Sequence, residues 1–119
     1  MILNEGGNIF KDPNGQIATR RINKADVAPT LSWLEQVTGL ELSANTLGTT
    51  GIAPTSGDID VAVDQSKVTK DELADKLTQW AVKNKQDPKQ WVKKSGISVH
   101  FKTPIKGSAN NGYVQTDLM

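Results

Sequence analysis

The chain has no cysteine and only one histidine among its 119 residues. The lack of thiols excludes disulfide scaffolds, zinc knuckles and cysteine nucleophiles. Its apolar runs are a few residues long, whereas a membrane-spanning helix needs roughly 20. Residues 1–5, Met-Ile-Leu-Asn-Glu, are not the basic start of a signal peptide. We therefore expect a soluble, cytoplasmic domain that does not bind membranes.

The chain also has little net charge. Its formal charge is +1, from 14 basic and 13 acidic residues, which excludes a uniformly basic nucleic-acid-coating protein and an acidic disordered tail. Residues 1–64 hold four basic and eight acidic side chains, whereas residues 65–106 hold ten lysines and four acidic side chains. This polarity fits a cation site beside a surface for a polyanion, or simply a solvated, lysine-bearing helix face.

Hydrophobic spacing predicts a single α+β domain. Helical periodicity covers residues 27–38 and begins again after Thr69, where Glu72 completes a capping box. Alternation predicts strands over 58–64, 97–102 and 113–118, while residues 87–96 fit a short helix or a strand. We expect a small mixed sheet with helices packed on one face. An N-terminal β-hairpin (residues 1–24) precedes a core (residues 25–119) that we expect to continue beyond Met119 in a longer protein.

Two carboxylates lie two residues apart on a predicted strand. Asp58 and Asp60 therefore share a face, about 7 Å apart along the strand, where like charges repel. A cation would relieve that repulsion, and oxygen-only ligands favour Mg²⁺ or Mn²⁺ over zinc. The alternative is an exposed strand face whose acidic side chains point to water. Asp117, on the last predicted strand, would come opposite the pair through antiparallel pairing.

A loop that suits phosphate binding precedes these carboxylates. Gly48, Thr49 and Thr50 lie about ten residues before Asp58, and glycine lets backbone N–H groups approach a phosphate with hydroxyls alongside. No Gly-Lys-Ser/Thr follows, so the segment is not a P-loop. Ser56, just before the strand, is a weaker candidate for the same role.

Together, Leu-Gly-Thr at 47–49, Gly-Asp-Ile-Asp-Val at 57–61 and Val-Gln-Thr-Asp-Leu at 114–118 resemble the nucleotidyltransferase superfamily of DNA polymerase beta. The family pattern is a hydrophobic residue, glycine and then glycine or serine, a variable gap, an Asp-x-Asp strand and a distant third carboxylate. The resemblance covers about residues 27–119.

This resemblance implies two-metal transfer of a nucleoside monophosphate from a nucleoside triphosphate to an acceptor hydroxyl on RNA, a protein or a small molecule. Asp58 and Asp60 would hold both ions, Mg²⁺ or Mn²⁺. Asp117 would hold one ion and help to deprotonate the attacking hydroxyl. The β and γ phosphates would contact Gly48, Thr49, Thr50 and Ser56. RNA or another polyanion would be the partner of the lysine-rich half.

Other interpretations remain open from the sequence. The chain could be a non-catalytic binding or scaffold domain of the same fold, or a sugar transferase that uses Asp-x-Asp with Mn²⁺. His100 fits sheet packing or the surface better than a role in a cleft. Trp91, among lysines, is a candidate nucleic-acid contact. The pair Arg20 and Arg21 fits surface solubility or a phosphate contact.

Overall fold

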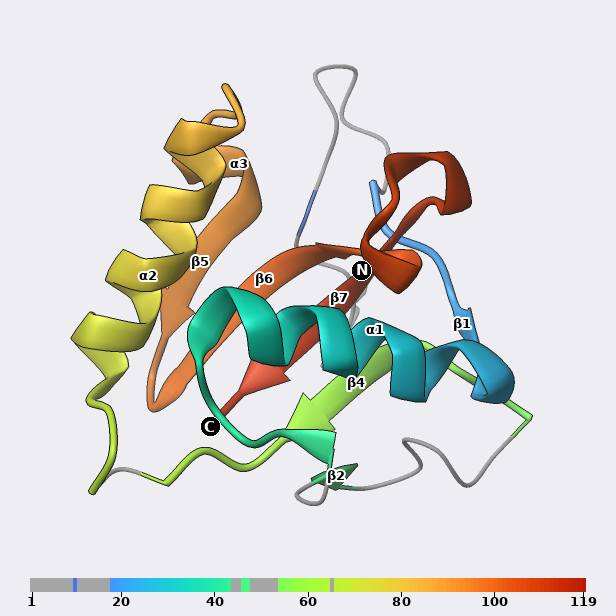
Figure 1. The fold of residues 1–119 in the computed structure, drawn as a ribbon, viewed down its shortest axis with the longest axis horizontal. Helices are drawn as coiled ribbons and strands as arrows, with labels where there is room; N and C mark the ends of the chain where they lie inside the picture. Colours follow the sequence, from blue (N-terminus) through green and yellow to red (C-terminus); the bar gives the residue numbers. More distant parts are fainter. Residues whose placement is uncertain (1–9, 11–17, 44–45, 48–53, 65) are drawn as a thin grey trace, which may run out of the picture.

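The computed structural model describes residues 10, 18–43, 46–47, 54–64 and 66–119, and shows helices against one face of a mixed sheet (Figure 1). The expected α+β class is confirmed. The helices are α1 (Lys24–Thr38), α2 (Lys70–Lys83) and α3 (Pro88–Trp91). The sheet has the order β2 (Thr46–Leu47), β4 (Asp58–Val61), β7 (Tyr113–Leu118), β6 (Ser98–Pro104) and β5 (Val92–Ser95). A separate ladder pairs β1 (Ile22–Asn23) with β3 (Thr55–Ser56), and two 3₁₀ turns, η2 (Ile105–Gly107) and η3 (Ala109–Asn111), precede β7.

Helix α1 begins three residues before the start that periodicity predicts. Contacts with a distant segment fix this start. Strand β1 pairs with β3 up to Asn23, and the N–H of Lys24, the first residue of the helix, donates to the Pro54 carbonyl. The helix ends where we expected. Gly39 adopts a left-handed conformation with φ 75°, and its N–H donates to the Glu35 carbonyl at 2.7 Å, the usual glycine C-cap.

Helix α2 has the predicted capping box. The Thr69 hydroxyl accepts from the Glu72 N–H, and the Glu72 carboxylate accepts from the Thr69 N–H. The segment 87–96 contains both of the elements between which the sequence left a choice. Asp87 caps the four-residue helix α3, and the chain then extends directly into β5.

Strand β7 lies between β4 and β6 and gives the sheet its mixed character. It is antiparallel to β6 and parallel to β4, with Asp60 opposite Asp117. The expected antiparallel pairing of the two acidic strands is therefore wrong. The chain crosses from β4 through α2 to the β5–β6 hairpin, and the return from β6 gives β7 the same direction as β4.

The two faces of the sheet differ in chemistry. One face packs Ile59, Val61, Phe101 and Leu118 into a core with residues of α1 and α2. Because side chains alternate along a strand, the opposite face carries the acidic residues of β4 and β7. The helices thus pack on the apolar face of the sheet and not on the acidic face (Figure 1).

An aromatic cluster fills part of the core. Trp80 contacts Trp33, Trp91 and Phe101 at ring-centroid distances of 5.3 to 5.5 Å. Trp91 is only 6 % exposed, and the Lys102 amino group lies 4.3 Å from its ring centroid. The interpretation of Trp91 as an exposed stacking contact for nucleic acid is therefore wrong, because the ring is buried and one face already meets a cation.

The expected N-terminal hairpin falls largely outside the described residues. Within them, the Ala18 N–H donates to the Phe10 carbonyl at 2.9 Å, as two facing strand residues would. In the part of the chain that the structure describes, no helix is long and apolar enough to cross a membrane.

Candidate metal centre

Three carboxylates converge on the polar face of the sheet. Asp58 and Asp60 lie on β4 with the apolar Ile59 between them, and the parallel ladder sets Asp117 of β7 beside Asp60. One carboxylate oxygen from each of the three lies within 4.8 Å of the others. The structure thus brings together the three acidic residues that the sequence proposed as metal ligands. The pairing is parallel, but it still places them on one face.

The electrostatics of this cluster disfavour three negative charges. Burial, followed by repulsion from Asp60 and Asp117, raises the pKa of Asp58 to about 6, against the opposing effect of Arg21. Burial and the Asp117 carboxylate also raise the pKa of Asp60, and His100 opposes this shift. Half-buried like charges at close range hold protons more tightly unless a cation compensates them. A divalent ion would supply that compensation.

Two neighbouring side chains, His100 and Gln115, form hydrogen bonds with the Asp117 carboxylate. Its Oδ1 lies 2.5 Å from His100 Nδ1 and accepts from the Nε2–H of Gln115 at 2.9 Å. Because an ionised carboxylate can only accept, we assign the proton of the first bond to His100 Nδ1. The His100 and Asp117 side chains are 15 % and 12 % exposed. The interpretation of His100 as a surface or packing residue missed this bond. Its place in an alternating strand was the available signal, but the partner became visible only with the β6–β7 register.

Arg21 lies beside the start of β4. Its Nε–H donates to Thr55 Oγ1 at 3.0 Å and an Nη2–H to the Thr55 carbonyl at 3.2 Å. A Cβ at Gly57 would come within 3.3 Å of Nη1, so the glycine gives the guanidinium room. Because this fixed positive charge lowers the pKa of Asp58, Arg21 belongs to the electrostatics of the centre. The sequence pattern alone did not single it out from Arg20.

The expected phosphate-binding residues are only partly described. Gly48, Thr49 and Thr50 lie outside the described residues. Ser56 lies on β3 opposite Ile22 and is 2 % exposed. Its role in phosphate binding stays a prediction.

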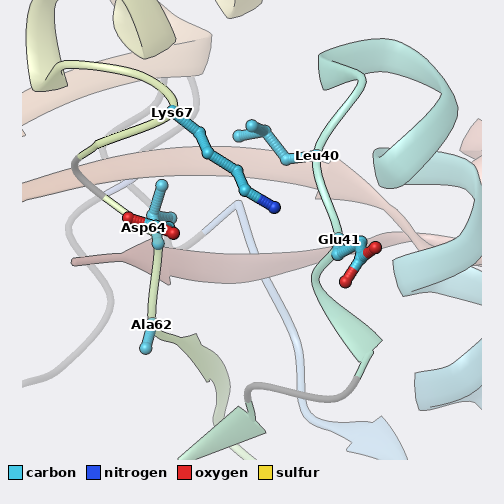
Figure 2. A pocket seen from close by; sticks show the side chains of 6 residues that line it. Leu40, Glu41, Ala62, Asp64 and Lys67 are labelled. Atoms are coloured by element: carbon cyan, nitrogen blue, oxygen red, sulfur yellow. The ribbon is translucent and has the colours of Figure 1, made fainter.

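A hollow of about 370 Å³ opens just beyond the end of β4 (Figure 2). The Lys67 side chain extends across it, toward the space between Leu40 and Glu41. Asp64, on its rim, accepts from the Ser66 N–H at 2.9 Å and the Ser66 hydroxyl at 2.6 Å, which lowers the pKa of Asp64. This hollow contains none of the three clustered carboxylates. The hollow has two acidic residues, Glu41 and Asp64, on separate segments and the second is satisfied by its own turn, whereas the sheet brings three carboxylates together. The cluster on the sheet is therefore the stronger candidate for chemistry.

No family model, curated protein or solved structure with which the chain was compared matches it. The chain's own geometry defines an α+β protein with helices on one face of its sheet and an acidic cluster, able to hold a metal ion, on the other.

Proposed function

We propose that the chain is a metal-dependent nucleotidyltransferase that moves a nucleoside monophosphate from a nucleoside triphosphate to an acceptor hydroxyl. The observation that carries the proposal is the convergence of Asp58, Asp60 and Asp117 within 4.8 Å. The resemblance in sequence pattern to the superfamily of DNA polymerase beta supports it, because the same three residues form the Asp-x-Asp pair and the distant third carboxylate.

The donor set fits divalent ions that prefer oxygen. Three carboxylates without histidine or thiol ligands suit Mg²⁺ or Mn²⁺, which complete their coordination with water and substrate phosphate. Burial and the neighbouring carboxylates raise the pKa values of Asp58 and Asp60, so cation binding would be coupled to proton release. When bound, two such ions would clamp the attacking and leaving oxygens and neutralise the charge that develops on them.

Asp117 would then have a different task from Asp58 and Asp60. Asp58 and Asp60 would hold both ions from one strand, and Asp117 would hold one ion and orient the attacking hydroxyl for loss of its proton. The loop residues Gly48 and Thr49 would contact the β and γ phosphates, as Thr50 and Ser56 would. Positioning supplies much of the remaining rate enhancement. We propose RNA, a protein or a small molecule as the class of acceptor, with RNA or another polyanion suited to the lysine-rich half.

The first test is calorimetric titration of the full chain with each nucleoside triphosphate, with Mg²⁺ or with EDTA. We expect binding only with Mg²⁺, and a loss of about 100-fold or more in Asp58→Asn and Asp60→Asn, since either change removes a charged ligand. The matched control is Asp64→Asn, which removes an exposed carboxylate just beyond the same strand. Equal binding in EDTA, or unchanged binding in both variants, contradicts the proposal.

The second test is transfer itself. The chain is incubated with Mg²⁺ and α-labelled triphosphates, and with RNA oligonucleotides, proteins or hydroxyl-bearing small molecules as acceptors. Each transfer should attach one labelled monophosphate and release one pyrophosphate. Metal-dependent nucleotide binding without transfer to any of these acceptors would favour a non-catalytic binding domain and count against the enzyme.

A further inference from the structure

Asp117 receives two hydrogen bonds on the same carboxylate oxygen. His100 Nδ1 lies 2.5 Å from Oδ1, and the Gln115 Nε2–H donates to the same Oδ1 at 2.9 Å. With Asp117 ionised, as a metal ligand is, the carboxylate accepts and His100 Nδ1 is the donor. A carboxylate oxygen offers about two lone-pair directions. Two donors therefore occupy the directions that Oδ1 has, and Oδ2 is the oxygen that a cation would meet.

The sheet fixes both donors. His100 lies directly across the antiparallel β6–β7 ladder from Asp117, and Gln115 precedes Asp117 by two residues on β7, so all three side chains share one face. Gln115 is buried, and the His100 and Asp117 side chains are 15 % and 12 % exposed. Hydrogen bonds in such a setting orient a side chain more firmly than bonds exposed to solvent.

We infer that His100 and Gln115 are positioning residues that turn Asp117 so that it coordinates a divalent ion through Oδ2 alone. This inference rests on the proposed metal centre. Both donors come from the same two paired strands as Asp117 itself. The third ligand is thus orientationally fixed before an ion arrives.

The fixed orientation has a measurable consequence. Partners that orient a metal ligand typically contribute 10- to 100-fold to metal affinity. Without the His100 donor, Oδ1 of Asp117 keeps only the Gln115 bond, so the carboxylate would turn more readily about its last torsion and present Oδ2 to the ion in a smaller share of the population. Loss of either donor should therefore weaken metal binding without unfolding the sheet.

The test is Mn²⁺ binding to the full chain, followed by electron paramagnetic resonance of the free ion. His100→Phe keeps a ring but removes the donor, and we expect its Mn²⁺ affinity to fall by about 10- to 100-fold. His100→Asn places an amide N–H near the position of Nδ1, and we expect it to restore most of the affinity. Ser98→Ala, on the same strand and the same face, should bind Mn²⁺ as the wild type does.

A second variant covers the case in which His100→Phe does not fold. Gln115→Met has nearly the same shape without the donor, and its affinity should also fall, with urea unfolding as the check on folding. Wild-type Mn²⁺ binding that neither His100→Phe nor Gln115→Met weakens overturns the inference but leaves the proposed function standing. Equal losses in His100→Asn and His100→Phe also overturn it, since the donor would then be irrelevant. No Mn²⁺ binding to the wild type overturns the proposed metal centre and the inference together.

Discussion

Replacing Asp58 with asparagine should stabilise the metal-free protein near neutral pH. Burial and the neighbouring carboxylates raise the Asp58 pKa from 3.8 to about 6, so the folded chain binds this proton more tightly than the unfolded chain does. A raised carboxyl pKa makes stability fall as the pH rises from 3.8 through 6. The shift corresponds to about 3 kcal/mol at full strength. Because the carboxyl is half-exposed and screened by solvent, we expect about 1 kcal/mol.

Urea unfolding in EDTA at pH 4 and pH 7.5 measures this effect. At pH 7.5 the Asp58→Asn variant should be more stable than the wild type by about 1 kcal/mol, a rise of about 0.5 to 1 M in the midpoint. At pH 4 the difference should be close to zero, because the wild-type carboxyl is then protonated in the folded protein. Comparing the two chains at each pH cancels the titration of carboxyls remote from the cluster, such as Glu35.

Mg²⁺ should reverse the order of the two proteins. An ion at 100 times its dissociation constant stabilises the folded state by about 2.7 kcal/mol, and the variant that lacks Asp58 should gain far less. Asp64→Asn is a control in which the free energy of unfolding should change in the opposite direction. Hydrogen bonds from Ser66 lower the Asp64 pKa, so removing that charge should destabilise the protein at pH 7.5. A variant Asp58→Asn that is less stable than the wild type in EDTA at pH 7.5 would refute the reasoning. A difference that is the same at both pH values would refute it too.

Two further changes test the surroundings of the site and the core. Arg21→Ala should raise the pKa of Asp58, because the guanidinium charge lowers it; carbon-detected NMR titration of the carboxyl in EDTA measures the shift. Gly107→Ala should destabilise the fold by about 2 to 3 kcal/mol, because the position has φ +76° and a Cβ there would overlap the Trp33 indole; urea unfolding measures the loss.

Each of these changes has a matched control. Arg20→Ala removes the neighbouring arginine and should leave the Asp58 pKa unchanged. If Arg20→Ala shifts the Asp58 pKa as much as Arg21→Ala does, the effect comes from total charge and not from the place of Arg21 beside Asp58. Gly96→Ala has a similar φ of +57° but open space around the new Cβ, so it should cost about 1 kcal/mol from backbone strain alone. Equal losses at Gly96 and Gly107 would contradict the overlap with Trp33.

The sequence predicts best where local chemistry decides the structure. The capping box of Thr69 and Glu72 and the left-handed Gly39 involve residues within a few positions of each other, and both helix boundaries appear in the structure. The shared face of Asp58 and Asp60 follows equally directly from strand alternation. These features need no knowledge of the rest of the fold.

Features that depend on contacts between distant residues could not be predicted from the sequence. The direction of β7 relative to β4 is set by the path through α2, β5 and β6, and alternation within a strand carries no information about direction. The same register decides that His100 meets Asp117. Arg21 meets Thr55 through the β1–β3 ladder, a pairing of two-residue strands too short to have a hydrophobic pattern of their own.

The parallel pairing of β4 with β7 also affects how the protein folds. Asp60 and Asp117 are separated by nearly half of the chain, because parallel strands need a crossover connection between them. Closing that loop costs conformational entropy of the chain before the contact between the strands stabilises it, and such pairings therefore form slowly. If the proposed ion requires all three carboxylates, it would bind tightly only after β4 and β7 have paired. Ion binding, followed in a stopped-flow refolding experiment, would then report when β4 and β7 pair.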